Sequence, residues 1–314
     1  MKKAVITGGA GFIGSHTADI LSACGIETVI VDNMSTGDRA NLTDGSFEVL
    51  YEADVTDREA LKDVFRNHPD IDGIVHLAAQ SKVGPSLVDP GYDAEINIQG
   101  TINLLELGRE YGVERFVFAS SAAVYGDTEI VPVTETAPAA PLSPYGVSKL
   151  SGEEYVKAYG RLYNMDTAVL RFANVYGPRQ KAAAESGVIT IFMNDILHGR
   201  RPVIFGDGKQ TRDFVYVKDV ARAVQAVLTK EVKSSPAVFN VGTGKEITVE
   251  NMLRHLCDIQ ETEYAPDFQE SRPGDIRRSC LDPSSLASAF SWRPETAFRE
   301  GLIETIRDYI RTLK

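Results

Sequence analysis

A glycine-rich turn near the N-terminus limits the possible folds of this chain more than any other stretch. Residues 4–7 are apolar and β-branched, as in a strand, and a helical pattern follows the turn as far as about Gly25. The turn between them, residues 8–14, has the spacing G-x-G-x-x-G. Such glycines let the backbone approach a pyrophosphate at the helix N-terminus, where free N–H groups and the helix dipole attract anions. The order strand, glycine turn and helix therefore predicts a dinucleotide site.

An acidic residue strengthens this prediction and selects the dinucleotide. The second predicted strand, residues 28–31, leads into Asp32. An acid about 20 residues beyond the glycine turn is expected to bind the ribose 2′-hydroxyl of NAD, and it would repel the 2′-phosphate of NADP. The sequence therefore predicts NAD as the cofactor.

Strands and helices alternate through the first half of the chain. Four further strands are predicted, around residues 47–51, 74–77, 116–119 and 168–172. Thr56 to Glu59 reads as a capping box that opens one of the intervening helices, and another helix spans about 94–111. This alternation indicates an α/β fold with a doubly wound parallel sheet, the Rossmann fold, over residues 1–173.

The regular alternation ends after residue 173. Glycines and prolines separate shorter elements over residues 174–314. We expect a smaller C-terminal substrate-binding region over the ligand edge of the sheet, with some elements returning to the Rossmann domain.

Composition excludes several other classes of protein. The 314 residues are 43% hydrophobic and 25% charged, and the net charge of −11 argues against nucleic-acid binding. Three scattered cysteines, Cys24, Cys257 and Cys280, are too few for a disulfide framework or a zinc cluster, and we expect no metal site. Neither a signal peptide nor a membrane-spanning apolar stretch is visible, so we expect a soluble cytoplasmic protein without a membrane partner.

The candidate chemistry lies at Tyr145 and Lys149. On a helix these residues share a face, and an ammonium near a phenol favours the phenolate, which lowers a pKa normally near 10. The pair would then provide a general base near neutral pH. Such pairs are common by chance, so its surroundings must decide. Ser121 ends a predicted strand and either binds a substrate hydroxyl or is a plain turn serine; Asn97 is equally open between a structural and a site role.

Taken together, these stretches resemble the extended short-chain dehydrogenase/reductase family over essentially the whole chain. The matching motifs are, in chain order, residues 7–14, Asp32-Asn33, Asp54-Val55, residues 76–79, Ser121 with residues 124–126, residues 145–149, residues 174–179, residues 212–214 and residues 272–275. Within this family the chain looks most like bacterial and archaeal UDP-glucose 4-epimerases.

The choice within the family depends on the residues after Ser121. Nucleotide-sugar dehydratases of the family carry Asp-Glu there, and UDP-glucuronate decarboxylases carry Glu, whereas this chain has Ala122 and Ala123. Elimination would lack its acid, so the resemblance favours a 4-epimerase. A reductase using the same three catalytic residues, a decarboxylase or a dehydratase remain alternatives, as does a non-catalytic NAD-binding regulator.

The resemblance implies a role for each motif residue. Tyr145 would remove the proton of the sugar 4-hydroxyl, Lys149 would stabilise the phenolate, and Ser121 would align the hydroxyl. The cofactor residues implied are Gly8, Gly11, Phe12, Ile13, Gly14, Asp32, Asn33, Asp54, Val55, Leu77, Ala78, Ala79, Gln80, Tyr145 and Lys149. The implied residues for a UDP-sugar substrate are Lys82, Val83, Ser121, Tyr145, Asn174, Val188, Val203, Phe205, Arg212, Arg272, Asp275 and Ser279.

Two further expectations follow from the resemblance. Epimerases restricted to non-acetylated sugars carry a bulky tyrosine where this chain has Ser279, so we expect room for a 2-acetamido group. We also expect a homodimer, formed through the helix with Tyr145 and the helix around residues 94–111.

Overall fold

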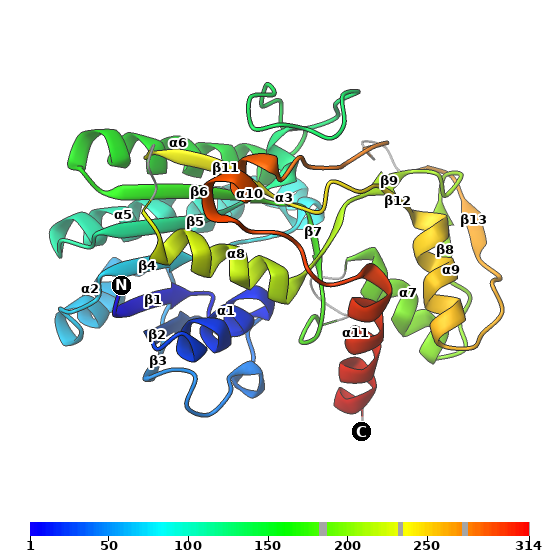
Figure 1. Cartoon of the computed structure of the whole chain (residues 1–314), viewed down its shortest axis with the longest axis horizontal. Helices are drawn as coiled ribbons and strands as arrows, with labels where there is room; N and C mark the ends of the chain where they lie inside the picture. The colour runs from blue at the N-terminus through cyan, green and yellow to red at the C-terminus, as the bar shows by residue number, and fades with distance from the viewer. Residues whose placement is uncertain (182–186, 232–234, 272–275, 314) are drawn as a thin grey trace.

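The central element of the fold is a seven-stranded parallel sheet. The computed structural model describes residues 1–181, 187–231, 235–271 and 276–313. The strand order is β11-β6-β5-β4-β1-β2-β3, which is the doubly wound order of a Rossmann fold with one additional strand (Figure 1). The predicted fold class is confirmed. The strands are β1 (Lys3–Thr7), β2 (Glu27–Asp32), β3 (Val49–Glu52), β4 (Gly73–His76), β5 (Arg115–Ser121), β6 (Asp166–Phe172) and β11 (Ala237–Val241).

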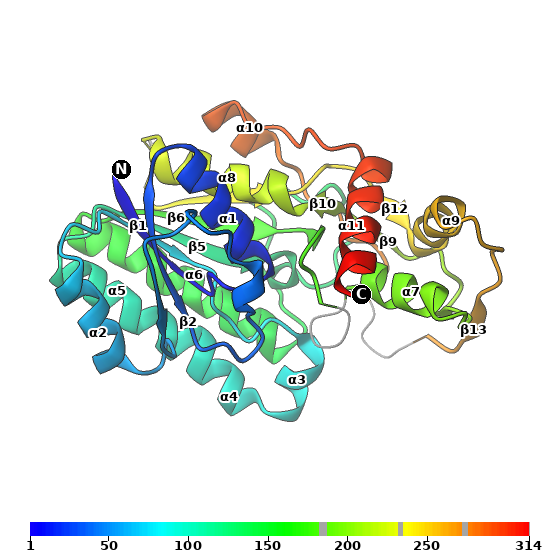
Figure 2. The same cartoon turned by 90° about the horizontal axis from the view of Figure 1, so that it is seen from below.

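Helices cover both faces of this sheet. One face carries α1 (Phe12–Ala23) and α8 (Val217–Thr229), and the other carries α2 (Arg58–Asn67), α5 (Gly100–Glu110) and α6 (Pro144–Tyr163) (Figure 2). Successive residues of each buried strand therefore enter different cores: Ile6 faces the first helix layer and Val5 the second. This is why the strands are apolar throughout rather than alternating with polar residues.

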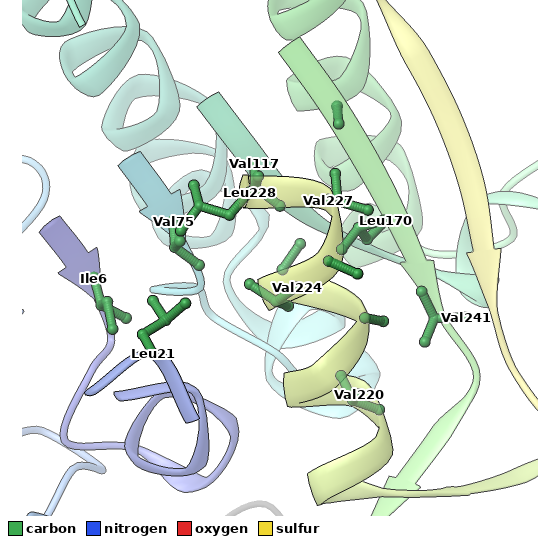
Figure 3. Close-up of a cluster of buried hydrophobic side chains, with 14 of the residues drawn as sticks. Ile6, Leu21, Val75, Val117, Leu170, Val220, Val224, Val227, Leu228 and Val241 are labelled. Carbon is green, nitrogen blue, oxygen red and sulfur yellow. The ribbon is translucent and has the colours of Figure 1, made fainter. Parts of the chain in front are cut away.

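The first core shows how a late segment of the chain completes the early sheet. Val220, Val224 and Val227 lie along one side of α8 and pack against strand residues such as Leu170 (Figure 3). The spacing of these valines is that of an apolar helix stripe. Both α8 and β11 follow residue 173 in sequence, yet they belong to the Rossmann layers.

The remaining C-terminal elements pack beside the sheet around their own apolar cluster, which includes Phe192, Phe214 and Leu253 (Figure 1). Its helices are α7 (Val188–Leu197), α9 (Val249–Ile259) and α11 (Phe298–Thr312), while α10 (Ser284–Phe290) contacts β11. Its short strands pair as β7 (Asn174–Tyr176) with β10 (Phe214–Tyr216), β8 (Val203–Phe205) with β13 (Asp267–Gln269), and β9 (Thr211–Arg212) with β12 (Ile247–Thr248).

One local prediction was wrong, and one predicted helix is present but irregular. The capping box at Thr56 does not form, because the Thr56 hydroxyl donates to Asp54 Oδ1 at 2.8 Å, while Asp57 caps α2 by accepting from the Ala60 N–H. The helix expected over residues 94–111 is a composite of α4 (Pro90–Ala94), a π-helical turn at Glu95–Gln99, and α5. The short helix α3 (Val83–Val88) precedes this composite helix.

None of the helices that the structure describes is long and apolar enough to cross a bilayer. Within the same residues, no group of three or more His, Cys, Asp or Glu side chains is arranged to hold a metal ion.

Candidate active site

A cavity of about 450 Å³ lies at the carboxyl edge of the sheet, where β1 and β4 are neighbours. This is the topological switch point at which doubly wound sheets bind their ligands. All the residues expected to bind the cofactor line this cavity: Gly8, Gly11, Phe12, Ile13, Gly14, Asp32, Asn33, Asp54, Val55, Leu77, Ala78, Ala79, Gln80, Tyr145 and Lys149. The structure thus brings together one complete set of predicted residues.

The glycine turn is shaped for a close approach of its backbone to a ligand. A side chain at Gly8, whose φ is +67°, would place a Cβ 2.8 Å from the Ala78 amide nitrogen, and one at Gly14 would lie 2.1 Å from the Gly8 carbonyl oxygen. Gly11 is the N-cap of α1 and has no side chain that could accept from the first N–H groups of the helix. These donors fit a pyrophosphate, so the site fits NAD by its chemistry.

Asp32 lies at the end of β2 and is fixed by the backbone around it. Its Oδ2 accepts from the Ala10 N–H at 3.0 Å and its Oδ1 from the Met34 N–H at 2.9 Å. Burial raises the pKa of this carboxyl, and the backbone donors oppose that shift. The loop after β2 closes over the carboxylate so tightly that a Cβ on Gly37 would lie 2.6 Å from Oδ1.

The three candidate catalytic residues meet where β5 and α6 approach one another. Ser143 caps α6 by accepting from the Gly146 N–H at 3.2 Å, and Pro144 begins the helix, which places Tyr145 in its first turn. Tyr145 and Ser121, at the end of β5, line the same cavity, and the Ser121 side chain acts on the Tyr145 phenol. Lys149 Nζ donates to the Ala119 carbonyl oxygen at 2.8 Å.

The protonation behaviour of this group differs from the sequence-based expectation. Burial raises the pKa of Tyr145 to about 12, although the hydrogen bond from Ser121 lowers it in part. Burial also lowers the pKa of Lys149 to about 8. The expectation that the ammonium lowers the pKa of the phenol to near neutral is contradicted, because burial disfavours the charged form of both groups.

A second cavity of about 350 Å³ adjoins the first, and Tyr145 lines both. Of the residues expected to contact substrate, Val83, Ser121, Tyr145, Asn174, Val188, Arg212 and Ser279 line this second cavity. Lys82 lines the first cavity instead, and Val203 and Phe205 lie on β8 without lining either. The predicted residues Arg272 and Asp275 lie outside the described residues.

Buried Asp213 holds together the loops that shape the second cavity. Its carboxylate accepts from the N–H groups of Thr243, Gly244 and Leu281, and from the Thr243 hydroxyl at 2.5 Å. The neighbouring Arg212 donates to the Ile276 carbonyl oxygen at 2.8 Å. These bonds draw the segment that contains Ser279 towards β9.

Sequence reasoning missed several residues that line the second cavity. Ser120 and Gln180 line both cavities, and Phe214 and Ile276 line the second. Gln180 directly follows the motif at residues 174–179, so extending that motif by one position would have found it. Ile276 sits in a loop, and no local pattern marked it.

Comparison with known proteins agrees with the NAD site described above. The model of the NAD dependent epimerase/dehydratase family matches residues 4–242. A UDP-glucose 4-epimerase of Thermotoga maritima, solved with UDP-glucose, superposes with a TM-score of 0.94 at 39% identity, covering 99% of this chain and 100% of that one.

Other relatives differ in substrate or reaction. A UDP-N-acetylglucosamine 4-epimerase of Methanobrevibacter ruminantium, solved with UDP-N-acetylmuramic acid, gives a TM-score of 0.93 at 35% identity and covers 99% of both chains. The dTDP-glucose 4,6-dehydratase 1 of Escherichia coli is 33% identical over 99% of this chain and 94% of its own length. The similarity therefore includes both epimerases and dehydratases.

Proposed function

The chain belongs to the NAD-dependent epimerase/dehydratase family, whose cofactor is NAD, and from this premise we propose that it is a UDP-sugar 4-epimerase. It would interconvert UDP-glucose and UDP-galactose through a transient 4-keto sugar. The observation that carries the proposal is the position of Tyr145, which lines both the cofactor cavity and the adjoining cavity and shares the second one with Ser121.

The lining of the second cavity favours epimerisation over elimination. Ala122 and Ala123 follow Ser121 on its wall, and no Asp or Glu occurs among the described residues that line this cavity. Elimination of water needs an additional acid or base near the sugar, whereas oxidation at C4 followed by reduction does not. The dehydratase alternative therefore lacks a candidate residue in this part of the chain.

The roles of the chain's own residues follow from the geometry. NAD, when bound, would supply the hydride acceptor and a positive charge on its oxidised ring, which would favour ionisation of Tyr145. Tyr145 then takes the proton of the 4-hydroxyl, with Ser121 aligning that hydroxyl. Lys149 is fixed by its bond to the Ala119 carbonyl oxygen and would stabilise the negative charge of the phenolate. Arg212, Asn174 and Val188 line the second cavity and would anchor the nucleotide while the sugar turns, with Arg212 holding the diphosphate.

We also propose that 2-acetamido sugars are accepted. Ser279 lines the second cavity with a small side chain, which leaves volume that a larger residue would fill. The relative from Methanobrevibacter ruminantium is named for an N-acetylated sugar. UDP-GlcNAc and UDP-GalNAc are thus candidate substrates beside the two hexoses.

A homodimer remains our proposal for the assembly, as expected from the sequence. The outer side of α6 carries exposed apolar residues, Val147, Tyr155 and Leu162, and Tyr92 is exposed on the preceding composite helix. An exposed apolar surface on neighbouring helices is typical of a subunit interface. Light scattering coupled to size-exclusion chromatography would report the mass directly.

One experiment tests the reaction class. The purified protein is incubated with a single UDP-sugar without added cofactor, and the products are identified by NMR. We expect inversion at C4 with no net oxidation. A 4-keto-6-deoxy sugar would show a dehydratase, and release of CO2 from UDP-glucuronate a decarboxylase. In a second incubation with added NADH, consumption of the NADH would show a reductase.

A further inference from the structure

A buried acid lies beside the candidate catalytic pair and was not among the predicted site residues. Asp93 in α4 is 1% exposed. Its Oδ1 accepts from Gln80 Nε2 at 2.7 Å and from Asn97 Nδ2 at 3.3 Å. Its Oδ2 is buried without a hydrogen-bond partner, and within the described ranges Asp93 forms no ion pair. Burying a carboxylate in this way is costly, so its retention needs an explanation.

The polar network around Asp93 joins the cofactor cavity to the catalytic helix. Asn97 accepts from the Gln80 N–H at 2.9 Å, donates back to the Gln80 carbonyl oxygen at 2.9 Å, and donates to Ser148 Oγ at 3.0 Å. Gln80 lines the cofactor cavity, and Ser148 directly precedes Lys149. Asn97 belongs to the π-helical turn Glu95–Gln99, a local irregularity that is frequent at functional sites.

Two buried acids act on Lys149, and in the described structure only one of them is paired with a cation. Glu153, one turn later on α6, is paired with Arg171 through contacts of 2.9 and 2.6 Å. His76 approaches from β4, and burial lowers the pKa of its ring to about 3, so it is neutral. Asp93 and Glu153 both raise the pKa of Lys149, but Asp93 alone of these two acids lacks a bound cation in the described structure.

We propose that Asp93 is a positioning residue: through Gln80 and Asn97 it ties the turn after β4 to the catalytic helix, and it places a buried negative charge near Lys149. The proposal rests on the function of Tyr145 and Lys149 proposed above. The same negative charge acts on Tyr145 and opposes its ionisation. The charge of Asp93 is therefore expected to favour the ammonium of Lys149 and to disfavour the phenolate of Tyr145.

The first test measures Lys149 itself and needs no turnover. In NAD-loaded protein with ¹³C-labelled lysine, the Lys149 resonance is assigned by its loss in Lys149→Arg and is titrated with pH. We expect Asp93→Asn to lower the Lys149 pKa by about one unit. Glu95→Gln removes the same charge from an exposed position two residues away and should leave the titration unchanged. Equal titrations in the two variants would overturn the proposal.

The second test is the pH profile of kcat with the substrate pair found above. Loss of the Asp93 charge should move the whole profile of Asp93→Asn to lower pH, because both Lys149 and Tyr145 then lose protons more readily. Asp93→Glu should return it towards the wild-type position. A purely structural role would instead reduce kcat at every pH without moving the profile.

The outcomes of the two tests are separable. If the wild-type protein turns over no UDP-sugar, the proposed function fails, while the lysine titration still decides the role of Asp93. If Asp93→Asn does not fold, Asp93→Ser replaces it in both tests, because the smaller side chain leaves space for water in the buried site.

Discussion

The two adjoining cavities are built in different ways. The cofactor cavity is formed by the ends of neighbouring strands of one sheet and by the glycine turn, whose backbone lines it. The second cavity combines one strand end with residues from distant segments, including Asn174, Arg212 and Ser279. Its shape depends on Asp213, which bonds to three separate loop positions. The first cavity is thus determined by the sheet, and the second by how the C-terminal region packs against it.

Tyr145 belongs to both cavities, so removing its hydroxyl should abolish turnover while leaving both sites intact. We expect Tyr145→Phe to lower kcat by about 10²- to 10⁴-fold, the usual contribution of a general acid or base. Binding of NAD and of UDP should stay within about threefold of wild type, measured by fluorescence and calorimetry. A non-catalytic NAD-binding regulator would keep its activity in this variant. Lost NAD binding would show that the phenol has a structural role instead.

A substitution in the glycine turn should weaken ligand binding in the cofactor cavity and leave binding in the second cavity almost unchanged. In Gly14→Ala the new Cβ would lie 2.1 Å from the Gly8 carbonyl oxygen, so the turn must open. We expect NAD affinity to fall by about 100-fold or more, while UDP affinity changes by less than about threefold. Gly91→Ala is the matched control, because its Cβ meets only Asp89 Oδ1 at 3.4 Å. Equal loss of both ligands would show that the cavities are not independent.

The difference between the cavities also explains what sequence could predict. The residues that line the cofactor cavity could be predicted from the sequence, because Gly8, Gly14 and Asp32 act through local backbone geometry that short motifs encode. Phe205 and Ile276 show the opposite case: the first was expected at the substrate site and does not line the second cavity, while the second was missed and does. Their positions depend on packing between segments far apart in sequence, which no local pattern records.

The protonation states of Tyr145 and Lys149 could not be predicted from their spacing in the sequence. The distance of four residues between Tyr145 and Lys149 correctly placed them on one helix, but it carried no information on burial. Burial changes the pKa of both groups in the directions that disfavour charge, and Asp93, whose position in sequence is unremarked by any motif, adds to the shift on Tyr145.

The pH dependence of stability tests a contact between α1 and the segment that follows residue 173. His16 on α1 is buried and pairs with the Pro178 carbonyl oxygen at 3.0 Å, and burial lowers the pKa of its ring to about 4. Because the unfolded ring has a pKa near 6.5, the unfolded state binds more protons between these values, and stability falls as pH drops through this window. Between pH 7 and pH 5 we expect His16 to account for about 2 kcal/mol of lost unfolding free energy.

Urea unfolding at the two pH values measures this contribution. The wild-type protein and His16→Gln are compared, and the variant should lose less stability on acidification even if it starts lower. Other buried groups, such as His76, are common to both proteins and cancel in the comparison. An identical loss in the two proteins would mean that His16 is already protonated in the folded state or is exposed to solvent.

The smallest expected effect concerns the second cavity alone. Ser279→Tyr fills space on its wall, so we expect kcat/KM for UDP-GlcNAc to fall by about tenfold or more relative to UDP-glucose, a range typical of steric exclusion in a pocket. Ser279→Ala keeps the space and should alter the ratio by less than about threefold. NAD affinity should be unchanged in both variants, because Ser279 does not line the cofactor cavity. If the tyrosine leaves the acetamido-to-hydroxyl preference as it is, this wall does not face C2 of the sugar, and the packing of the C-terminal region selects its substrate elsewhere.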